Sequence, residues 1–123
     1  SQLKFVEHCK NMPLAYKVSD LVVSASIEPE AFGRVVIEAQ SMEKAIIASD
    51  IGGSNETIVD NETGFFFKSN NSNSLSKKIV EVLNLDQSRL KLIGIEARKN
   101  IIKKFNVEKM CFSTYAEYKK LLN

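Results

Sequence analysis

Three short apolar runs, each followed by a segment with helical periodicity, constrain the fold of this chain more than any other feature. The runs cover residues 21–26, 45–49 and 64–67. Nearly continuous apolar runs are typical of parallel strands that are buried on both faces. A fourth segment, residues 3–8, alternates apolar and polar side chains and also predicts a strand. The sequence therefore predicts an α/β fold of three layers, in which helices cover both faces of a parallel sheet.

Helical patterns lie between and after these runs. Proline at position 13 favours the start of a short helix, and residues 31–43 predict an amphipathic helix that begins near Phe32 or Gly33. A glycine turn at residues 50–53 leads into another short helix, and Ser74 is expected to be the N-cap of the next one. The apolar stripes of the longer helices are Phe32, Val35, Val36, Ala39 and Met42; Leu75, Ile79, Val82 and Leu83; Leu90, Ile93, Ala97, Ile101 and Ile102; and Met110, Tyr115, Tyr118, Leu121 and Leu122.

The length and composition fit one soluble domain. The chain has 123 residues, enough for a single core, and we expect residues 1–68 to form an α/β part and residues 74–123 a helical part. A net charge of +2 argues against nucleic acid as a partner. The two cysteines have no metal-binding or redox spacing and are expected to stay reduced. Doubly wound domains usually have more than four strands and the first residue is not Met, so the domain is expected to be truncated upstream.

Two glutamates, Glu30 and Glu38, bracket the predicted start of the helix after the strand at residues 21–26. Ligands of open α/β sheets bind beyond the carboxyl ends of the strands, which is where this loop lies. If both glutamates were helical they would be about 12 Å apart along the axis, too far for one small group. With Glu30 in the loop, an extended ligand could reach both acids and place a phosphate on the free N–H groups near Gly33. The alternative is that Glu30 interacts only with the helix dipole and Glu38 is a solvated helix residue.

Three ordered motifs resemble the retaining group 1 (family 4) glycosyltransferases of the GT-B fold. The segment EAFGRVVIEA resembles their E-x7-E signature. MPLAYKVSDLVVSAS and AIIASDIGGSNETIVDNETGFFF resemble the family segments before and after that signature. The resemblance covers residues 3–68 and implies a Rossmann-like domain, the C-terminal, donor-binding half of such an enzyme.

The resemblance also implies roles for individual residues. Members transfer a sugar from a nucleotide diphosphate sugar to a hydroxyl acceptor with retention at the anomeric carbon. Glu38 would bind the ribose hydroxyls and Glu30, the residue implied as catalytic, the hydroxyls of the donor sugar. No cofactor or metal is implied, because helix N-termini and basic side chains offset the charge of the leaving diphosphate. The remaining donor-site residues implied are Ala31, Phe32, Gly33 and Val35, and His8 would border the base. Gly52 and Gly53 would form part of the floor near the donor, or alternatively only a left-handed turn.

The sequence departs from the family pattern at several positions. Glu7 replaces a glycine near the base, Glu43 and Ala45 replace residues of the turn before a strand, and Asn55 replaces a proline. The family's basic pair on the diphosphate and its N-terminal domain, which binds a carbohydrate or lipid-linked acceptor, both lie upstream of this segment. The isolated chain is therefore expected to be inactive.

Other functions stay open. One is a GT-B-like module that binds a nucleotide or sugar phosphate without turnover. Another is a flavodoxin-like signalling domain with Asp50 as phosphoacceptor, although no acidic pair accompanies it. A cytoplasmic location is expected, with the alternative of peripheral attachment to the inner face of a membrane. The last helix resembles the segment that crosses to the N-terminal domain in the family. Its apolar stripe is expected to drive self-association of the isolated chain and includes Phe112, Tyr115, Tyr118 and Leu122.

Overall fold

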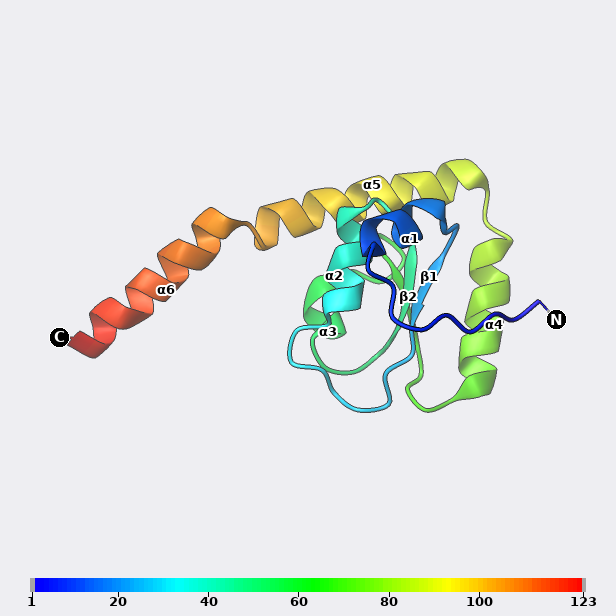
Figure 1. The fold of residues 1–123 in the computed structure, drawn as a ribbon, viewed down its shortest axis with the longest axis horizontal. Coiled ribbons are helices and arrows are strands. Elements are labelled where there is room, and N and C mark those ends of the chain that lie inside the picture. Colours follow the sequence, from blue (N-terminus) through cyan, green and yellow to red (C-terminus); the bar gives the residue numbers. More distant parts are fainter. Residues whose placement is uncertain (1, 123) are drawn as a thin grey trace.

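The computed structural model describes residues 2–122, and their core is a three-stranded parallel sheet (Figure 1). The strands are β1 (Val22–Ser24), β2 (Ile46–Ser49) and β3 (Phe65–Phe67), in the spatial order β1-β2-β3. All four residues of β2 are buried, as expected for the central strand of a parallel sheet. The parallel sheet and three of the four predicted strands are confirmed.

The predicted strand at residues 3–8 is wrong. This segment has no regular secondary structure, and the side chains of Phe5 and Val6 are 93% and 80% exposed. Alternation of apolar and polar residues predicts a strand only where a neighbouring strand can pair with it. Within residues 2–122 the sheet ends at β1 on this side. The expected burial of β1 on both faces is wrong for the same reason, since Val23 is 39% exposed at this edge.

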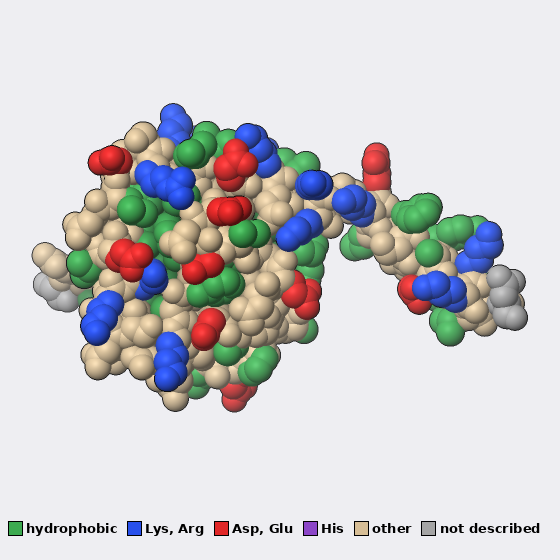
Figure 2. All heavy atoms as spheres, turned by 180° about the vertical axis from the view of Figure 1, so that it is seen from behind, with side chains coloured by type: hydrophobic (Ala, Val, Ile, Leu, Met, Phe, Trp, Pro, Cys, Tyr) green, Lys and Arg blue, Asp and Glu red, His purple; other side chains and the backbone are tan. Residues whose placement is uncertain are grey.

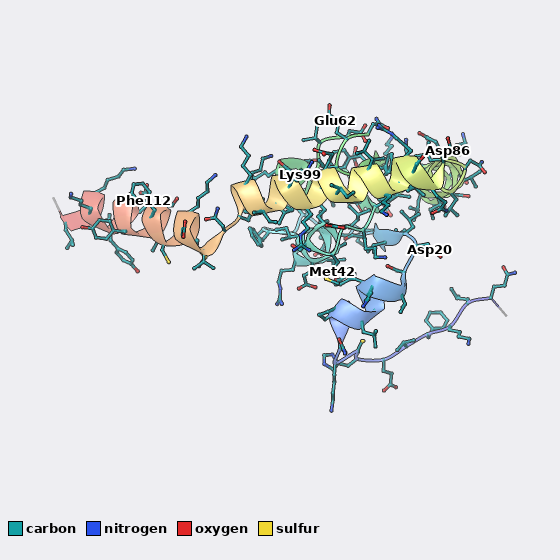
Figure 3. All side chains as sticks on the ribbon, turned by 90° about the horizontal axis from the view of Figure 1, so that it is seen from above. Asp20, Met42, Glu62, Asp86, Lys99 and Phe112 are labelled. Carbon is teal, nitrogen blue, oxygen red and sulfur yellow. The ribbon has the colours of Figure 1, made fainter. Side chains whose placement is uncertain are left out.

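Helices α1 (Met12–Val18) and α2 (Arg34–Ser41) cover one face of the sheet. Side chains alternate along β2, so Ile46 and Ala48 face this layer and pack with Tyr16 and Val36. The short helix α3 (Ser54–Thr57) follows β2 through the predicted glycine turn. Figure 3, a view from above, shows α2 lying between α1 and α5. This layer carries Glu38, whereas Glu30 lies in the loop between β1 and α2.

Helices α4 (Ser72–Leu83) and α5 (Gln87–Lys104) form the second layer, where Ile47, Phe65 and Phe67 meet Val82 and Ile93. The three-layer architecture is thereby confirmed. The N-cap of α4 is Asn71 and not Ser74, since the Asn71 side chain accepts a hydrogen bond from the Ser74 N–H at 2.8 Å. The Ser74 hydroxyl instead accepts from the Lys68 N–H. Several residues expected in buried stripes are exposed. Phe32 lies in the loop before α2, and Val35, Leu83 and Ile102 lie outside the narrow faces that α2, α4 and α5 turn toward the core.

The last helix, α6 (Val107–Leu122), projects away from the three layers (Figure 1). It has no buried residue among those described. Figure 2 shows hydrophobic side chains along this projecting arm, and in Figure 3 the helix continues past α5, with Phe112 on it. The amphipathic helix predicted here is confirmed, but its apolar side contacts nothing in the described part of the chain that would bury it.

Candidate functional site

The loop that follows β1 carries Glu30 and is held against the loop that follows β2. The Gly53 N–H donates a hydrogen bond of 2.8 Å to the Glu30 carbonyl oxygen. A Cβ on Gly52 would lie 2.7 Å from that same oxygen, and Gly52 also has a φ of +60°. A Cβ on Gly53 would lie 2.8 Å from the carbonyl carbon of Phe32. Both glycines are therefore needed for the backbone of the Glu30 loop to lie this close, while their contribution to donor binding stays a prediction.

The Glu30 carboxylate lies at the carboxyl end of the parallel strands and is exposed. Its Oε1 atom accepts a hydrogen bond of 2.7 Å from the Ser26 hydroxyl, just beyond β1. A hollow of about 10 Å³ lies beside it, lined by serine side chains that include Ser24, Ser49 and Ser54. This volume holds about one water molecule and no sugar. A sugar that contacts Glu30 must therefore lie on the outer side of the loop, or the loop must move.

Helix α2 begins directly after Gly33, as the sequence predicts. Gly33 has a φ of +65° and supplies no side-chain cap to the first turn of the helix. The Val36 and Ile37 N–H groups bond to the Gly33 carbonyl, so the helix is formed from its first turn. A helix N-terminus without a side-chain cap can accept an anionic group on its first N–H groups. The expected phosphate position therefore lies between the loop with Glu30 and the helix with Glu38.

Glu38 lies one turn inside α2 and is half-buried. Its Oε2 atom accepts a hydrogen bond of 2.9 Å from the Tyr16 hydroxyl of α1. Its Oε1 atom lies 3.4 Å from the Arg34 guanidinium, whose side chain is 84% exposed. Burial, together with the hydrogen bond and negative charge of Glu38, raises the pKa of the Tyr16 hydroxyl to about 12. The contact with Tyr16 was not predicted from the sequence, because Tyr16 and Glu38 are 22 positions apart in the chain.

Each of the two glutamates is thus held by a side chain from a different element. Ser26 holds Glu30 from the end of β1, and Tyr16 holds Glu38 from α1. Glu38 is therefore not fully solvated, because its carboxylate accepts a hydrogen bond from the buried Tyr16, and its role toward a ribose stays a prediction. The structure therefore presents one acid before the first turn of α2 and one after it, with the uncapped helix N-terminus between them.

The other predicted donor-site residues have mixed surroundings. Ala31, Phe32 and Val35 are exposed, whereas Gly33 is buried. The Phe32 ring packs edge-on against Phe105, with the ring centroids 5.6 Å apart. A groove of about 860 Å³ lies beside this pair, where α5 meets α6, and was not predicted from the sequence. His8 is exposed in the segment without regular structure, so nothing in the described residues ties it to Glu30 or Glu38.

Asp50, the phosphoacceptor of the flavodoxin-like alternative, has a partner in the fold. The Asp50 carboxylate accepts a hydrogen bond of 2.8 Å from the Ser69 N–H and so fastens the loop after β3. This is a structural role and needs no phosphoacceptor chemistry. Among residues 2–122, no three His, Cys, Asp or Glu side chains gather in a way that could hold a metal ion.

Comparison with known proteins identifies the family. The family model for "Glycosyl transferases group 1" matches residues 1–104. An uncharacterised glycosyltransferase of Methanocaldococcus jannaschii is 36% identical over 105 residues, which are 85% of this chain and 29% of the relative. A capsular polysaccharide biosynthesis glycosyltransferase of Staphylococcus aureus, CapM, is 36% identical over 63% of this chain and 20% of its own length.

Solved structures agree with this result. The Anabaena protein HepE in complex with UDP-glucose superposes with a TM-score of 0.87 and 26% identity, over 95% of this chain and 32% of HepE. A glycosyltransferase of Rickettsia africae superposes with a TM-score of 0.78 and 42% identity, over 89% of this chain and 29% of that structure. The fold and the match to the family model thus define a domain of a GT-B glycosyltransferase. The chain belongs to the group 1 glycosyltransferases, and it spans less than a third of the length of these relatives.

Proposed function

We propose that this chain supplies the donor site of a retaining glycosyltransferase that transfers a sugar from a nucleotide diphosphate sugar to a hydroxyl acceptor. The observation that carries the proposal is the order of groups around the start of α2. The Glu30 carboxylate comes first, then the uncapped helix N-terminus at Gly33, then the Glu38 carboxylate. A donor sugar, a diphosphate and a ribose follow one another in the same order along a nucleotide diphosphate sugar. The bound UDP-glucose of HepE, a structural neighbour, supports this donor class.

Each group has a chemical task in the proposed site. Glu38 accepts hydrogen bonds from the vicinal ribose hydroxyls. The first N–H groups of α2 carry positive partial charge and stabilise the diphosphate as negative charge develops on it during bond breakage. Glu30 accepts hydrogen bonds from the donor sugar and so places its anomeric carbon near the acceptor. Backbone groups from Ala31 to Val35 line the path between the two acids.

The rest of the proposal concerns groups outside this chain. The acceptor, a carbohydrate or a lipid-linked carbohydrate, is bound by another domain of the complete protein. No metal is required, because the helix N-terminus and basic side chains of the complete protein offset the diphosphate charge. The proposed location is the cytoplasm, where nucleotide sugars are made, or the inner face of a membrane. None of the helices in the described range 2–122 is long and apolar enough to span a bilayer.

The test is transfer by the full-length protein from a panel of nucleotide diphosphate sugars, with the anomeric configuration of the product read by NMR. We expect transfer from at least one donor with retained configuration, and loss of donor binding in Glu38→Ala. Inverted product would contradict retention. Donor binding without transfer to any acceptor would favour the non-catalytic binding module, and absence of donor binding would overturn the proposal.

A further inference from the structure

The Tyr16–Glu38 hydrogen bond has a structural basis that extends well beyond the two side chains. Helix α1 is fixed at both ends. At its start the Asn11 side chain accepts a hydrogen bond from the Leu14 N–H at 3.1 Å. At its end the Lys44 ammonium donates to the carbonyl oxygens of Lys17 and Ser19, at 3.0 and 2.9 Å. A seven-residue helix that is anchored twice in this way keeps its side chains in fixed directions.

The ring of Tyr16 is fixed as well. Only 5% of the residue is exposed, and the ring packs in the cluster formed by α1, α2 and β2, next to Val36 and Ala39. These two residues lie on the same helix as Glu38. A buried ring leaves the phenol hydroxyl little freedom, and its direction is toward Oε2 of Glu38. The hydroxyl is therefore a pre-set donor at one oxygen of the carboxylate.

The two oxygens of Glu38 have unequal partners. Oε2 has the buried tyrosine at 2.9 Å, whereas Oε1 has only the exposed Arg34 at 3.4 Å. Exposed ion pairs spaced i, i+4 on a helix are weak and screened by salt, so a ligand can displace Arg34 easily. A hydrogen bond from a neutral donor to a charged acceptor is considerably stronger than such an exposed ion pair, and the bond from Tyr16 is partly shielded from water. A ligand that approaches α2 thus finds Oε1 available and Oε2 already engaged.

We propose that Tyr16 is a positioning residue for donor recognition: its hydroxyl holds Oε2 of Glu38 so that Oε1 is presented in one orientation to the ribose hydroxyls. This proposal rests on the proposed function, because it assumes that Glu38 binds the ribose. Tyr16 itself contacts no ligand. The loss of the Tyr16 hydroxyl is therefore expected to change how strongly the protein prefers a nucleotide with the ribose 2′-hydroxyl over one without it.

The experiment measures the ratio of the dissociation constants of 2′-deoxy-UDP and UDP on the full-length protein by calorimetry. In the parent protein we expect a ratio of about 10 or more, the value of one hydrogen bond to a charged group. Tyr16→Phe keeps the ring in its pocket and removes only the hydroxyl, so the ratio should fall at least about threefold. Tyr115→Phe, which removes a hydroxyl from the exposed face of α6, should leave the ratio unchanged.

Glu38→Gln separates the failure of this proposal from the failure of the proposed function. If Glu38→Gln lowers the ratio but Tyr16→Phe does not, the positioning role of Tyr16 is wrong and the ribose role of Glu38 stands. If Glu38→Gln leaves the ratio unchanged, the ribose role fails and the proposal about Tyr16 fails with it. If both variants lower the ratio, the proposal requires that the ratio in the double variant be no lower than in Glu38→Gln alone.

A second measurement needs no variant at Tyr16 and applies even if Tyr16→Phe fails to fold. The hydroxyl proton of Tyr16 is expected to exchange slowly with water and to give an NMR signal in the parent protein. Because UDP is expected to use Oε1, that signal should persist when UDP is added. Its loss on UDP binding would show that the ligand displaces the hydroxyl from Glu38, and would overturn the proposal.

Discussion

The Tyr16 hydroxyl lies 2.9 Å from Oε2 of Glu38 and joins the short helix α1 to the helix that carries the candidate donor site. Tyr16 and Glu38 are 22 positions apart in the chain. The contact forms because β1 separates α1 from α2 in sequence, and both helices pack on the same face of the sheet. One consequence is a titration that can be measured directly.

The ionisation of Tyr16 is expected near pH 12, because burial and the neighbouring Glu38 carboxylate raise its pKa to about 12 from the ordinary value of 10.0. The tyrosinate absorbance of the parent protein minus that of Tyr16→Phe isolates this step. Glu38→Gln should move the step to lower pH, since it removes the neighbouring negative charge. A step near pH 10 in the parent would contradict the buried, hydrogen-bonded position of the hydroxyl.

The same titration predicts how stability depends on pH. The pKa of Tyr16 is higher in the folded state than in the unfolded state, so the folded protein retains the proton between pH 10 and 12. The stabilisation is therefore fully present below pH 10 and is lost as pH rises through 12. We expect the free energy of unfolding of the parent to fall relative to that of Tyr16→Phe across this window, measured by urea unfolding at a series of pH values.

Glu30 is expected to act on the sugar and not on the nucleotide. In the full-length protein, Glu30→Gln should lower sugar transfer about tenfold or more, because a charge-assisted hydrogen bond contributes about 1.5–3 kcal/mol. Affinity for UDP should change by less than about twofold, since Glu30 lies before the helix N-terminus that is expected to bind the diphosphate. Glu28→Gln, an exposed glutamate of the same loop, is the matched control. Equal losses of transfer and UDP affinity in Glu30→Gln would remove Glu30 from the sugar role.

Gly52 is expected to be required for the position of the Glu30 loop. In Gly52→Ala the new Cβ would lie 2.7 Å from the Glu30 carbonyl oxygen, in addition to the strain of a φ of +60°. Gly33→Ala is a matched control, because φ is +65° there but the nearest atom would be at 3.7 Å. Backbone strain alone costs about 1–3 kcal/mol, and the clash should add about 1 kcal/mol or more in Gly52→Ala. Equal losses of unfolding free energy in the two variants, measured in urea, would show that the Glu30 loop shifts away from the new Cβ without loss of stability.

The sequence predicts those parts of the fold that depend on local patterns. The continuous apolar run of β2 is buried as expected, and α2 begins after Gly33 as expected. The errors concern partners that a local pattern does not specify. Residues 3–8 have the alternation of a strand, but no neighbouring strand among the described residues pairs with them. Asn71 and Ser74 both have side chains that can cap a helix, so the sequence alone does not decide that Asn71 caps α4.

In the candidate site, too, the sequence predicts what depends on local order and not the contacts between distant segments. The order of Glu30, Gly33 and Glu38 along the chain is sufficient to predict one acid in the loop and one in the helix. The residues that hold these acids are less accessible to sequence reasoning. Tyr16 reaches Glu38 only through the packing of α1 on α2, and the close contact of Gly52 with the Glu30 loop depends on two strands being neighbours.

Self-association is expected for residues 1–123 produced alone, because α6 has an uncovered apolar side. Phe112, Tyr115 and Leu122 are 75%, 65% and 86% exposed. Exposed apolar surface of this kind favours association between copies. The double variant Phe112→Ser/Tyr115→Ser should shift the mass in solution toward that of a monomer, measured by light scattering. Lys109→Ser/Glu117→Ser, which changes two charged residues of α6, should not, and a monomeric parent chain would contradict the prediction.

Sugar transfer by residues 1–123 alone is expected to be absent even though the core should fold. The chain spans less than a third of the length of its relatives, so in the proposed function the acceptor site lies elsewhere in the complete protein. Holding donor and acceptor together can supply about 7–11 kcal/mol of the barrier, and this contribution is lost without the acceptor site. In the described residues the first turn of α2 also lacks a buried cation, since Arg34 is 84% exposed and paired with Glu38. Transfer assays with several donors, run beside the full-length protein, check this expectation, and turnover of about 1 per second or more by the isolated chain would contradict it.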